Sequence, residues 1–338
     1  MRRIAFMNQK GGVGKTTTVA NLGAALAELG RRVLAVDIDP QANLTTHLDH
    51  DLDVETGATI YEVLTGRAEP ADAIRQTATA NLWLLPATID LSGAEIELVA
   101  EFGRDTLLRE ALANHFATLP EGERPEFVLI DCPPSLGILS LNALTTAREV
   151  MIPIQTQFFA LRGMSKLMDV IGLVKKRLNP DLTVSAIIPS IVDFRTNLTR
   201  EVMHEIRSYF GEKMTRTAIR TNIRLAEAPS HGLSIFAYDR AARGAEDFLN
   251  LAREILGEEV PQGDDRAIEA EVDAESASDA TSIPIVPPLA EPAEEADSPE
   301  IPPLKFDDLP PAIPFPVDHR LEGQPEPPGG VEPQSEVR

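Results

Sequence analysis

The chain has 338 residues, of which 43% are hydrophobic and 25% charged, enough for one large or two ordinary domains with a packed core. Its single cysteine, Cys132, excludes a disulfide framework and is typical of a reducing compartment. No run approaches the roughly 18 apolar residues that a membrane-spanning helix needs. The apolar stretch behind Arg2 and Arg3 is too short for an export signal, so we expect a cytoplasmic protein without membrane partners.

The formal net charge of −22 is unevenly distributed along the chain. Residues 258–338 hold 21 acidic and 4 basic side chains, a net charge of −17, whereas the remaining body carries −5. The same segment contains 16 of the 27 prolines and has neither helical nor strand periodicity. Because such a composition cannot form a packed core, we predict one domain over residues 1–257 and an acidic, Pro-rich, disordered tail over residues 258–338.

The role of this tail is left open by its composition. Repulsion between like charges would keep it extended, as in a spacer or solubilising segment. Three short apolar islands, around Ile283, Phe306 and Phe315, would instead suit docking to a partner in a polyproline II conformation.

Taken in chain order, the body alternates strand-like and helix-like segments. Short apolar runs typical of buried strands occupy residues 4–7, 33–36, 82–85, 127–130, 150–154 and 184–188. Longer segments with helical character include residues 17–29, 105–116, 161–178 and 199–210. This βαβ rhythm predicts an α/β fold, a doubly wound, mostly parallel sheet with helices on both faces, in which ligands bind at the carboxyl ends of the strands.

The first strand leads directly into a glycine-rich loop, Lys10-Gly11-Gly12-Val13-Gly14-Lys15-Thr16-Thr17. Backbone N–H groups of such a loop converge on one anion, and the following helix adds the positive end of its dipole. In this pattern Lys15 contacts the β- and γ-phosphates, while the Thr16 hydroxyl ligates Mg²⁺. The sequence therefore predicts a nucleotide site. We expect ATP, because no [NT]-K-x-D element for guanine follows a strand.

Two acidic motifs also follow predicted strands, Asp37-Ile38-Asp39-Pro40-Gln41 and Asp131-Cys132-Pro133-Pro134. In the first, a carboxylate can face the γ-phosphate and its attacking water. Asp131, in the second, fits the Walker B arrangement that holds Mg²⁺ directly or through water, although an aspartate at a strand end can also cap a turn. Since the carboxyl ends of parallel strands meet at one edge, these motifs and the glycine-rich loop point to one pocket.

The glycine-rich loop departs from the general pattern, because Gln9 replaces its first glycine and Lys10 adds a second lysine. Residues 8–18 resemble the deviant Walker A box of the ParA/MinD ATPases. Further segments similar to ParA-type partition ATPases are residues 37–41, 86–88, 93–98, 131–137 and 227–232. The likeness covers about residues 3–256. Because the loop lies so close to the start, we expect the short, Soj-like subgroup without a helix-turn-helix domain.

The resemblance implies a role for each matching residue. Lys10 would cross a homodimer interface to the nucleotide of the other subunit, although the sequence also allows a solvated loop lysine. Asp39 matches the aspartate needed for hydrolysis, which we expect to be slow. The implied catalytic residues are Lys10, Lys15 and Asp39, and the implied metal ligands are Thr16, Asp39 and Asp131. The implied nucleotide-binding residues are Lys10, Gly11, Gly12, Val13, Gly14, Lys15, Thr16, Thr17 and Pro229.

Residues 193–243 hold nine basic and six acidic side chains, a local excess of positive charge in an acidic body. Non-specific DNA binding depends on phosphate neutralisation and counterion release, for which such a patch suffices in a dimer. The resemblance implies that Arg195 and Arg224 bind DNA. Without it, scattered arginines would indicate an ordinary solvated surface.

These features together favour an ATP-dependent dimerisation switch. We expect it to bind DNA non-specifically at the nucleoid and to segregate chromosome or plasmid DNA with a ParB-like partner that stimulates hydrolysis. The acidic end disfavours MinD-like membrane recruitment, and one cysteine excludes an iron–sulfur cluster of the nitrogenase-reductase type. The alternative is a ParA-like adaptor ATPase that positions a non-DNA cargo, such as a chemoreceptor array, through its tail.

Overall fold

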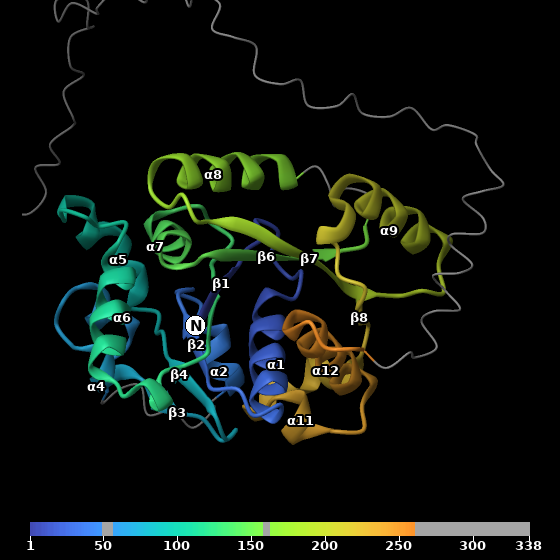
Figure 1. The fold of residues 1–338 in the computed structure, drawn as a ribbon, viewed down its shortest axis with the longest axis horizontal. Coiled ribbons are helices and arrows are strands. Elements are labelled where there is room, and N and C mark those ends of the chain that lie inside the picture. The colour runs from blue at the N-terminus through green and yellow to red at the C-terminus, as the bar shows by residue number, and fades with distance from the viewer. Residues whose placement is uncertain (49–56, 158–162, 261–338) are drawn as a thin grey trace, which may run out of the picture. The chain divides into compact units, whose positions relative to one another are not determined.

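The computed structural model describes residues 1–48, 57–157 and 163–260. Within them, eight strands form one sheet of order β3-β4-β2-β5-β1-β6-β7-β8 (Figure 1). Every neighbouring pair is parallel except β3 and β4, which are antiparallel. The prediction of a mostly parallel α/β sheet is therefore confirmed.

All six predicted strands are present; the strand over residues 82–85 has the predicted ends, and the other five have one or both ends shifted. The strands are β1 (Arg2–Phe6), β2 (Val33–Asp37), β3 (Arg75–Gln76), β4 (Leu82–Leu85), β5 (Phe127–Asp131), β6 (Glu149–Gln155), β7 (Thr183–Val192) and β8 (Ile219–Arg220). Sequence reasoning missed β3 and β8, because two residues are too few to establish an alternating pattern.

Twelve α-helices lie in the described part of the chain. They are α1 (Lys15–Glu28), α2 (Asn43–Leu48), α3 (Ile60–Leu64), α4 (Pro70–Ala73), α5 (Leu91–Glu97), α6 (Leu107–Thr118), α7 (Ile138–Thr146), α8 (Met164–Arg177), α9 (Asn197–Phe210), α10 (Ile223–Glu227), α11 (Ile235–Tyr238) and α12 (Arg243–Leu256). Short 3-10 turns are η1 (Leu98–Ala100), η2 (Glu121–Glu123), η3 (Gly211–Lys213) and η4 (Ala228–His231). None of these helices is long and apolar enough to cross a membrane.

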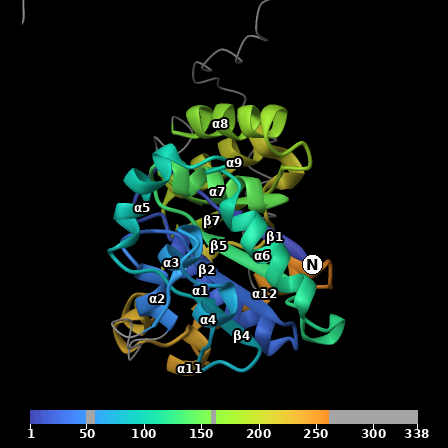
Figure 2. The ribbon, with the colours of Figure 1, turned by 90° about the vertical axis from the view of Figure 1, so that its left-hand side faces the viewer.

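Two apolar cores lie on the two faces of the sheet. In β1, Ile4 and Phe6 belong to the core that also contains residues of α1, α11 and α12, whereas Ala5 belongs to the core shared with α6 to α9. Successive side chains of a strand point to opposite faces, which explains this division. Figures 1 and 2 show α7, α8 and α9 on one side of the sheet and α1, α11 and α12 on the other, which confirms helices on both faces.

Three expectations extend beyond the described residues. The predicted helix 161–178 corresponds to α8, but residues 161–162 are not described. Of the predicted tail, only residues 258–260 are described, so its disorder and the islands at Ile283, Phe306 and Phe315 lie outside the structure. Among the described helices α12 is the last, and Gly257 follows it in a left-handed conformation with φ of 74°. The domain boundary at residue 257 stays a prediction.

Candidate functional site

The glycine-rich loop joins β1 to α1 through two residues in the left-handed backbone region. Gly12 has φ of 72° and Gly14, the residue that precedes the helix, has φ of 86°. Only glycine adopts this conformation without strain, which explains these two positions. The first turn of α1 holds no acidic residue and Gly14 offers no capping side chain, so no side chain of the helix itself neutralises the positive end of its dipole. This arrangement fits a phosphate.

The loop is fixed from the sheet side by β6 and β7. Ser190 Oγ donates a 2.6 Å hydrogen bond to the Val13 carbonyl, and Gln155 Nε2 donates one of 3.1 Å to the Gly12 carbonyl. Asn8 Nδ2 donates to the Pro153 carbonyl at 2.8 Å. These contacts therefore hold the loop in the observed conformation. Sequence reasoning missed Ser190 and Gln155, because the contacts join segments far apart in the chain.

The two lysines of the loop occupy different environments. Lys15, at the start of α1, is only 7% exposed. Lys10 is exposed, and its Nζ donates to the side-chain oxygens of Gln155, at 3.2 Å, and of Gln157. Lys15 thus lies within the site, whereas the Lys10 ammonium lies on the surface with neutral partners.

Asp131, the last residue of β5, lies next to the start of α1. Thr16 Oγ1 donates a 2.6 Å hydrogen bond to Asp131 Oδ2, and the other carboxyl oxygen, Oδ1, is buried without a hydrogen-bond partner. Burial, and then the nearby charge of Asp37, raise the pKa of Asp131 well above its usual range. A buried oxygen without a partner is costly unless a ligand satisfies it.

This arrangement fits Mg²⁺. The ion prefers oxygen ligands and keeps several waters, so one or two protein oxygens beside phosphate oxygens suffice. Within the described residues, no group of three or more His, Cys, Asp or Glu side chains could hold a metal. Thr16 and Asp131 would therefore hold Mg²⁺ together with nucleotide phosphates rather than as a resident metal centre.

The two aspartates at the carboxyl end of β2, Asp37 in the strand and Asp39 just after it, have separate roles in the structure. Asp37 is fully buried, and its Oδ2 accepts hydrogen bonds from the Thr45 N–H at 2.9 Å and the Thr45 hydroxyl at 2.8 Å. Its Oδ1 accepts one from the Asp39 N–H at 3.1 Å. Burial raises the pKa of Asp37 to about 6. Because both of its oxygens have partners, Asp37 holds the turn that carries Asp39.

Asp39 is the carboxylate of this pair that can serve a ligand. It is 7% exposed, and its Oδ1 accepts a 3.0 Å hydrogen bond from the Gln41 N–H. The strand ends that carry the acidic motifs are adjacent, since Asp37 and Asp131 are register partners in β2 and β5. The structure therefore brings together the glycine-rich loop and both acidic motifs, as expected from the topology.

Pro229 belongs to a segment that packs against α1 and α2. It lies half-buried in η4, which packs against α2. The side chain of Asn21 in α1 accepts a 2.7 Å hydrogen bond from the Ile235 N–H. Buried His47 of α2 hydrogen-bonds to the Leu233 backbone, and its burial lowers its pKa to about 4. Sequence reasoning singled out neither Asn21 nor His47, and the adenine contact of Pro229 stays a prediction.

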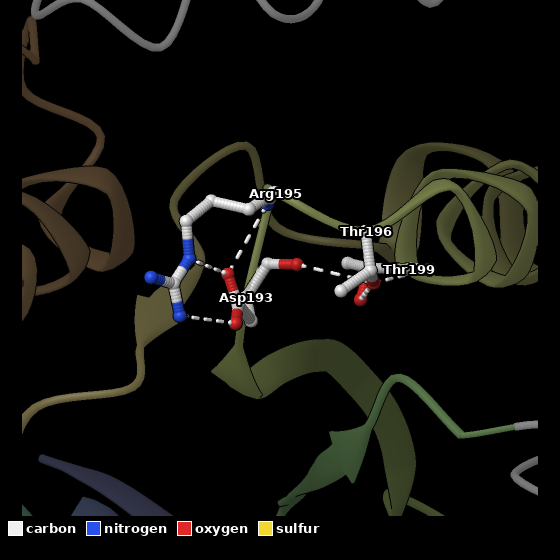
Figure 3. A network of polar contacts seen from close by, with 4 residues as sticks. All are labelled: Asp193, Arg195, Thr196 and Thr199. Atoms are coloured by element: carbon white, nitrogen blue, oxygen red, sulfur yellow. Dashed lines mark hydrogen bonds and ion pairs between the residues drawn. The ribbon is translucent and has the colours of Figure 1, made fainter.

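The two predicted DNA-binding arginines lie on the surface. Arg195 follows β7, and its side chain is 87% exposed and paired with Asp193 (Figure 3). Arg224 lies exposed in α10, where it pairs with Glu227 at 2.8 Å and with Asp239 at 3.5 Å. Both residues follow strands parallel to β1, so they belong to the same edge of the sheet as the nucleotide site.

One residue counted in the basic segment has a structural role instead. The side chain of Arg220 in β8 is 21% exposed and pairs with Asp247, which is 3% exposed, at 2.5 Å, and with Glu246 at 3.0 Å. This pair joins β8 to α12. The basic surface is therefore smaller than the count of charges in residues 193–243 suggested.

Comparison with known proteins identifies the family. The family model described as an AAA domain matches residues 1–184. The sporulation initiation inhibitor protein Soj of Bacillus subtilis is 47% identical over 253 residues, which cover 75% of this chain and 97% of that protein. The chromosome partitioning protein ParA of Caulobacter vibrioides is 43% identical and covers 77% of this chain and 95% of its own length.

Solved structures agree with this fold. Cobyrinic acid a,c-diamide synthase of Mycobacterium smegmatis with bound ADP and magnesium is 38% identical, with a TM-score of 0.65, over 78% of this chain and 99% of that chain. The septum site-determining protein MinD of Pyrococcus horikoshii, complexed with Mg-ADP, is 29% identical, with a TM-score of 0.59, over 75% and 95% of the two chains.

The comparisons confirm the predicted P-loop fold, the ATPase activity, and ATP with Mg²⁺ as cofactors. They leave the individual site residues as predictions, supported by the geometry described above. With nearly the full length of the curated relatives covered, this chain belongs to the Soj/ParA family of chromosome-partitioning ATPases.

Proposed function

We propose that this ATPase is a nucleotide-driven dimerisation switch. ATP-bound subunits form a dimer, and the dimer binds DNA without sequence preference. Hydrolysis then separates the two subunits and releases the DNA. The placement of Lys10 carries this proposal, because a buried lysine, Lys15, already serves the site of the same subunit. Lys10 is exposed beside that site, and its ammonium contacts neutral glutamines.

Because the Lys10 ammonium is exposed, it can supply a positive charge to the nucleotide site of another subunit. The contacts with Gln155 and Gln157 hold Lys10 in place without neutralising it. In a dimer whose nucleotide sites face each other, Lys10 would contact the phosphates bound by the other subunit. ATP carries more negative charge at this position than ADP, so its γ-phosphate would favour the dimer, and this differential affinity shifts the population.

The residues around the phosphates have separable tasks in hydrolysis. Lys15 and the N–H groups at the start of α1 bind and orient the phosphates. When bound, Mg²⁺ neutralises charge that develops on the β- and γ-phosphates. Asp39, held by the turn that Asp37 fixes, orients the attacking water. Positioning and electrostatic stabilisation dominate this chemistry, and without a partner's contribution we expect slow turnover.

DNA binding is assigned to the surface that carries Arg195 and Arg224. Both side chains are exposed, as contact with a phosphate backbone requires. Their position at the same sheet edge as the nucleotide would let one dimer present both pairs of arginines to DNA. Such binding is electrostatic and weakens steeply with salt.

The cargo and partner follow from the relatives rather than from the site. Curated relatives bear the names of chromosome-partitioning proteins, which favours chromosome or plasmid segregation at the nucleoid with a ParB-like partner. A basic amino-terminal peptide of such a partner should stimulate hydrolysis by this chain. Absence of stimulation would favour an adaptor that positions another cargo.

The trans role of Lys10 is tested by Lys10→Ala, with Lys176→Ala as the control. Lys176 is exposed on α8, so its removal changes the net charge equally. We expect Lys10→Ala to retain ATP binding but to lose ATP-dependent dimerisation, measured by light scattering, and partner-stimulated hydrolysis. The Lys176 variant should behave as wild type. Normal dimerisation and hydrolysis by Lys10→Ala would eliminate the trans-lysine mechanism.

A further inference from the structure

The exposed ion pair between Asp193 and Arg195 has the geometry of a carboxylate that occupies a phosphate-binding fork. Arg195 Nε donates to Asp193 Oδ1 at 2.8 Å, and Arg195 Nη2 donates to Oδ2 at 2.7 Å. A guanidinium binds a phosphate through the same kind of parallel N–H pair. Asp193 therefore uses the donors that Arg195 would offer to DNA (Figure 3).

The local backbone keeps the two side chains together. The Arg195 N–H donates to Asp193 Oδ1 at 3.1 Å, and the Thr196 N–H donates to the Asp193 carbonyl at 3.4 Å. Thr196 Oγ1 then accepts from the Thr199 N–H and caps α9. The backbone of the turn between β7 and α9 therefore holds the Asp193 carboxylate beside Arg195.

The ion pair between Asp193 and Arg195 is exposed, so another anion can replace Asp193 at little cost in stability. Its side chains are 87% and 36% exposed, and exposed ion pairs contribute little to folding. Arg220 forms a comparable pair with Asp247, but that carboxylate is buried and the pair joins two elements. The hydrogen bonds from Arg195 lower the pKa of Asp193 to about 2, so the carboxylate stays ionised at neutral pH.

We propose that Asp193 is an internal counterion of Arg195 that DNA phosphate must displace, and that it thereby limits DNA affinity. This inference rests on the proposed DNA-binding function and adds a regulation of that surface. Displacement leaves the Asp193 carboxylate close to a phosphate, where like charges repel. It also reduces the net release of counterions, because Asp193 regains a cation when DNA takes its place.

The variant Asp193→Asn isolates this effect. Asparagine has the same shape, and its Oδ1 can still accept the Arg195 N–H, so the turn is preserved while the charge is removed. Asp181→Asn is the matched control. Asp181 precedes the amino end of β7 and Asp193 follows its carboxyl end, so the two lie roughly 30 Å apart along this strand.

The experiment measures binding of full-length protein with ATP and Mg²⁺ to a duplex of arbitrary sequence, from 50 to 200 mM salt. For each subunit of the dimer, we expect Asp193→Asn to raise the DNA affinity roughly five- to tenfold over wild type at 0.1 M salt. The slope of log affinity against log salt concentration should become steeper by about one. Asp181→Asn should leave the affinity almost unchanged. Arg195→Ala should weaken binding, and adding Asp193→Asn to it should restore much less affinity than Asp193→Asn gains in the wild-type protein.

Two outcomes would overturn the inference alone while the proposed function stands. One is that wild type binds DNA with ATP and Asp193→Asn binds no more tightly. Equal binding would mean that the Asp193 charge does not limit affinity, and weaker binding would mean that Asp193 orients Arg195 for DNA. The other is a gain of the same size in the Arg195→Ala background, which would indicate a general effect of charge without displacement from Arg195. Failure of wild type and Asp193→Asn alike to bind DNA at 50 mM salt would instead reject the proposed function, and the inference with it.

Discussion

The sheet edge formed by the carboxyl ends of the parallel strands has two parts, a nucleotide edge around the glycine-rich loop and a basic edge around Arg195 and Arg224, and these two parts treat charge in opposite ways. At the nucleotide edge, made of residues 10–17 with Asp37, Asp39 and Asp131, the carboxylates are buried and one oxygen of Asp131 has no partner. At the basic edge, Arg195 and Arg224 are exposed and already paired with carboxylates of their own chain. At the nucleotide edge, a buried oxygen without a partner requires a ligand to satisfy it. At the basic edge, the exposed ion pairs contribute little to folding, so another anion can replace their carboxylates.

One strand physically connects the two edges. In β7, Ser190 donates to the Val13 carbonyl of the glycine-rich loop, and Arg195 follows five residues later. Between them, Ile191 has φ of 55°, and the pairing with β8 changes register between Ser190 and Val192. A β-branched residue in the left-handed region is strained, so the surrounding contacts must hold this bulge.

The largest effect is expected at the nucleotide edge from Asp39→Ala. Loss of the carboxylate that orients water should lower the hydrolysis rate about 100-fold or more, the size of effect expected when a reacting group is no longer held in position. ATP affinity should change little, because Lys15 and the loop remain. Single-turnover hydrolysis and nucleotide titration separate these effects. A variant that hydrolyses ATP at the wild-type rate would remove Asp39 from the mechanism.

The contrast in burial predicts different costs for two neighbouring threonines. Thr45→Val removes the hydroxyl that donates to Asp37 and accepts from the Ala87 N–H, and we expect a loss of about 2 kcal/mol of unfolding free energy. Thr46→Val, on the exposed side of α2, should cost much less, since its hydroxyl is exposed and donates to the Ala42 carbonyl at 3.1 Å. Denaturant titration compares them. Equal losses of unfolding free energy would mean that the hydrogen bond from Thr45 to Asp37 adds no more stability than the surface contact of Thr46.

The basic edge is tested by charge reversal at Arg224. Arg224→Glu should weaken DNA binding at least about tenfold at 0.1 M salt and flatten its salt dependence, with ATP binding intact. Arg148→Glu is the matched control, because Arg148 is 61% exposed but precedes β6 at the opposite edge of the sheet. Equal loss in both variants would indicate a diffuse charge effect without a defined surface.

The smallest effect concerns the buried His47, whose lowered pKa makes stability depend on pH. Its contribution is complete above the unfolded pKa of 6.5 and is lost as pH falls toward the folded pKa of about 4, because the unfolded chain binds the proton more readily. Between pH 7 and 6 the unfolding free energy should fall by about 1 kcal/mol or less from this residue. His47→Gln should remove that part of the slope, and an unchanged slope would contradict the assignment.

The sequence was informative where chemistry is encoded in neighbouring residues. Glycines at left-handed positions, Lys15 and Thr16 lie together in one loop, and Asp131 ends an apolar strand, so both motifs were predictable. Ser190 was not, because it meets Val13 across 177 positions in the chain. Thr45 shows the same limit, because its hydroxyl joins Asp37 to Ala87. Asp193 lies only two positions from Arg195, but the pattern of residues does not show that the two side chains pair.

The central claim is that ATP at the nucleotide edge controls DNA binding at the basic edge. Its most direct test is co-sedimentation of the protein with DNA in ATP and in ADP, using wild type and Asp39→Ala across a salt series. The account predicts binding with ATP but not with ADP, a steep fall with salt, and persistent binding by Asp39→Ala because its ATP is not hydrolysed. Equal binding in ATP and ADP, or binding that is insensitive to salt, would contradict it.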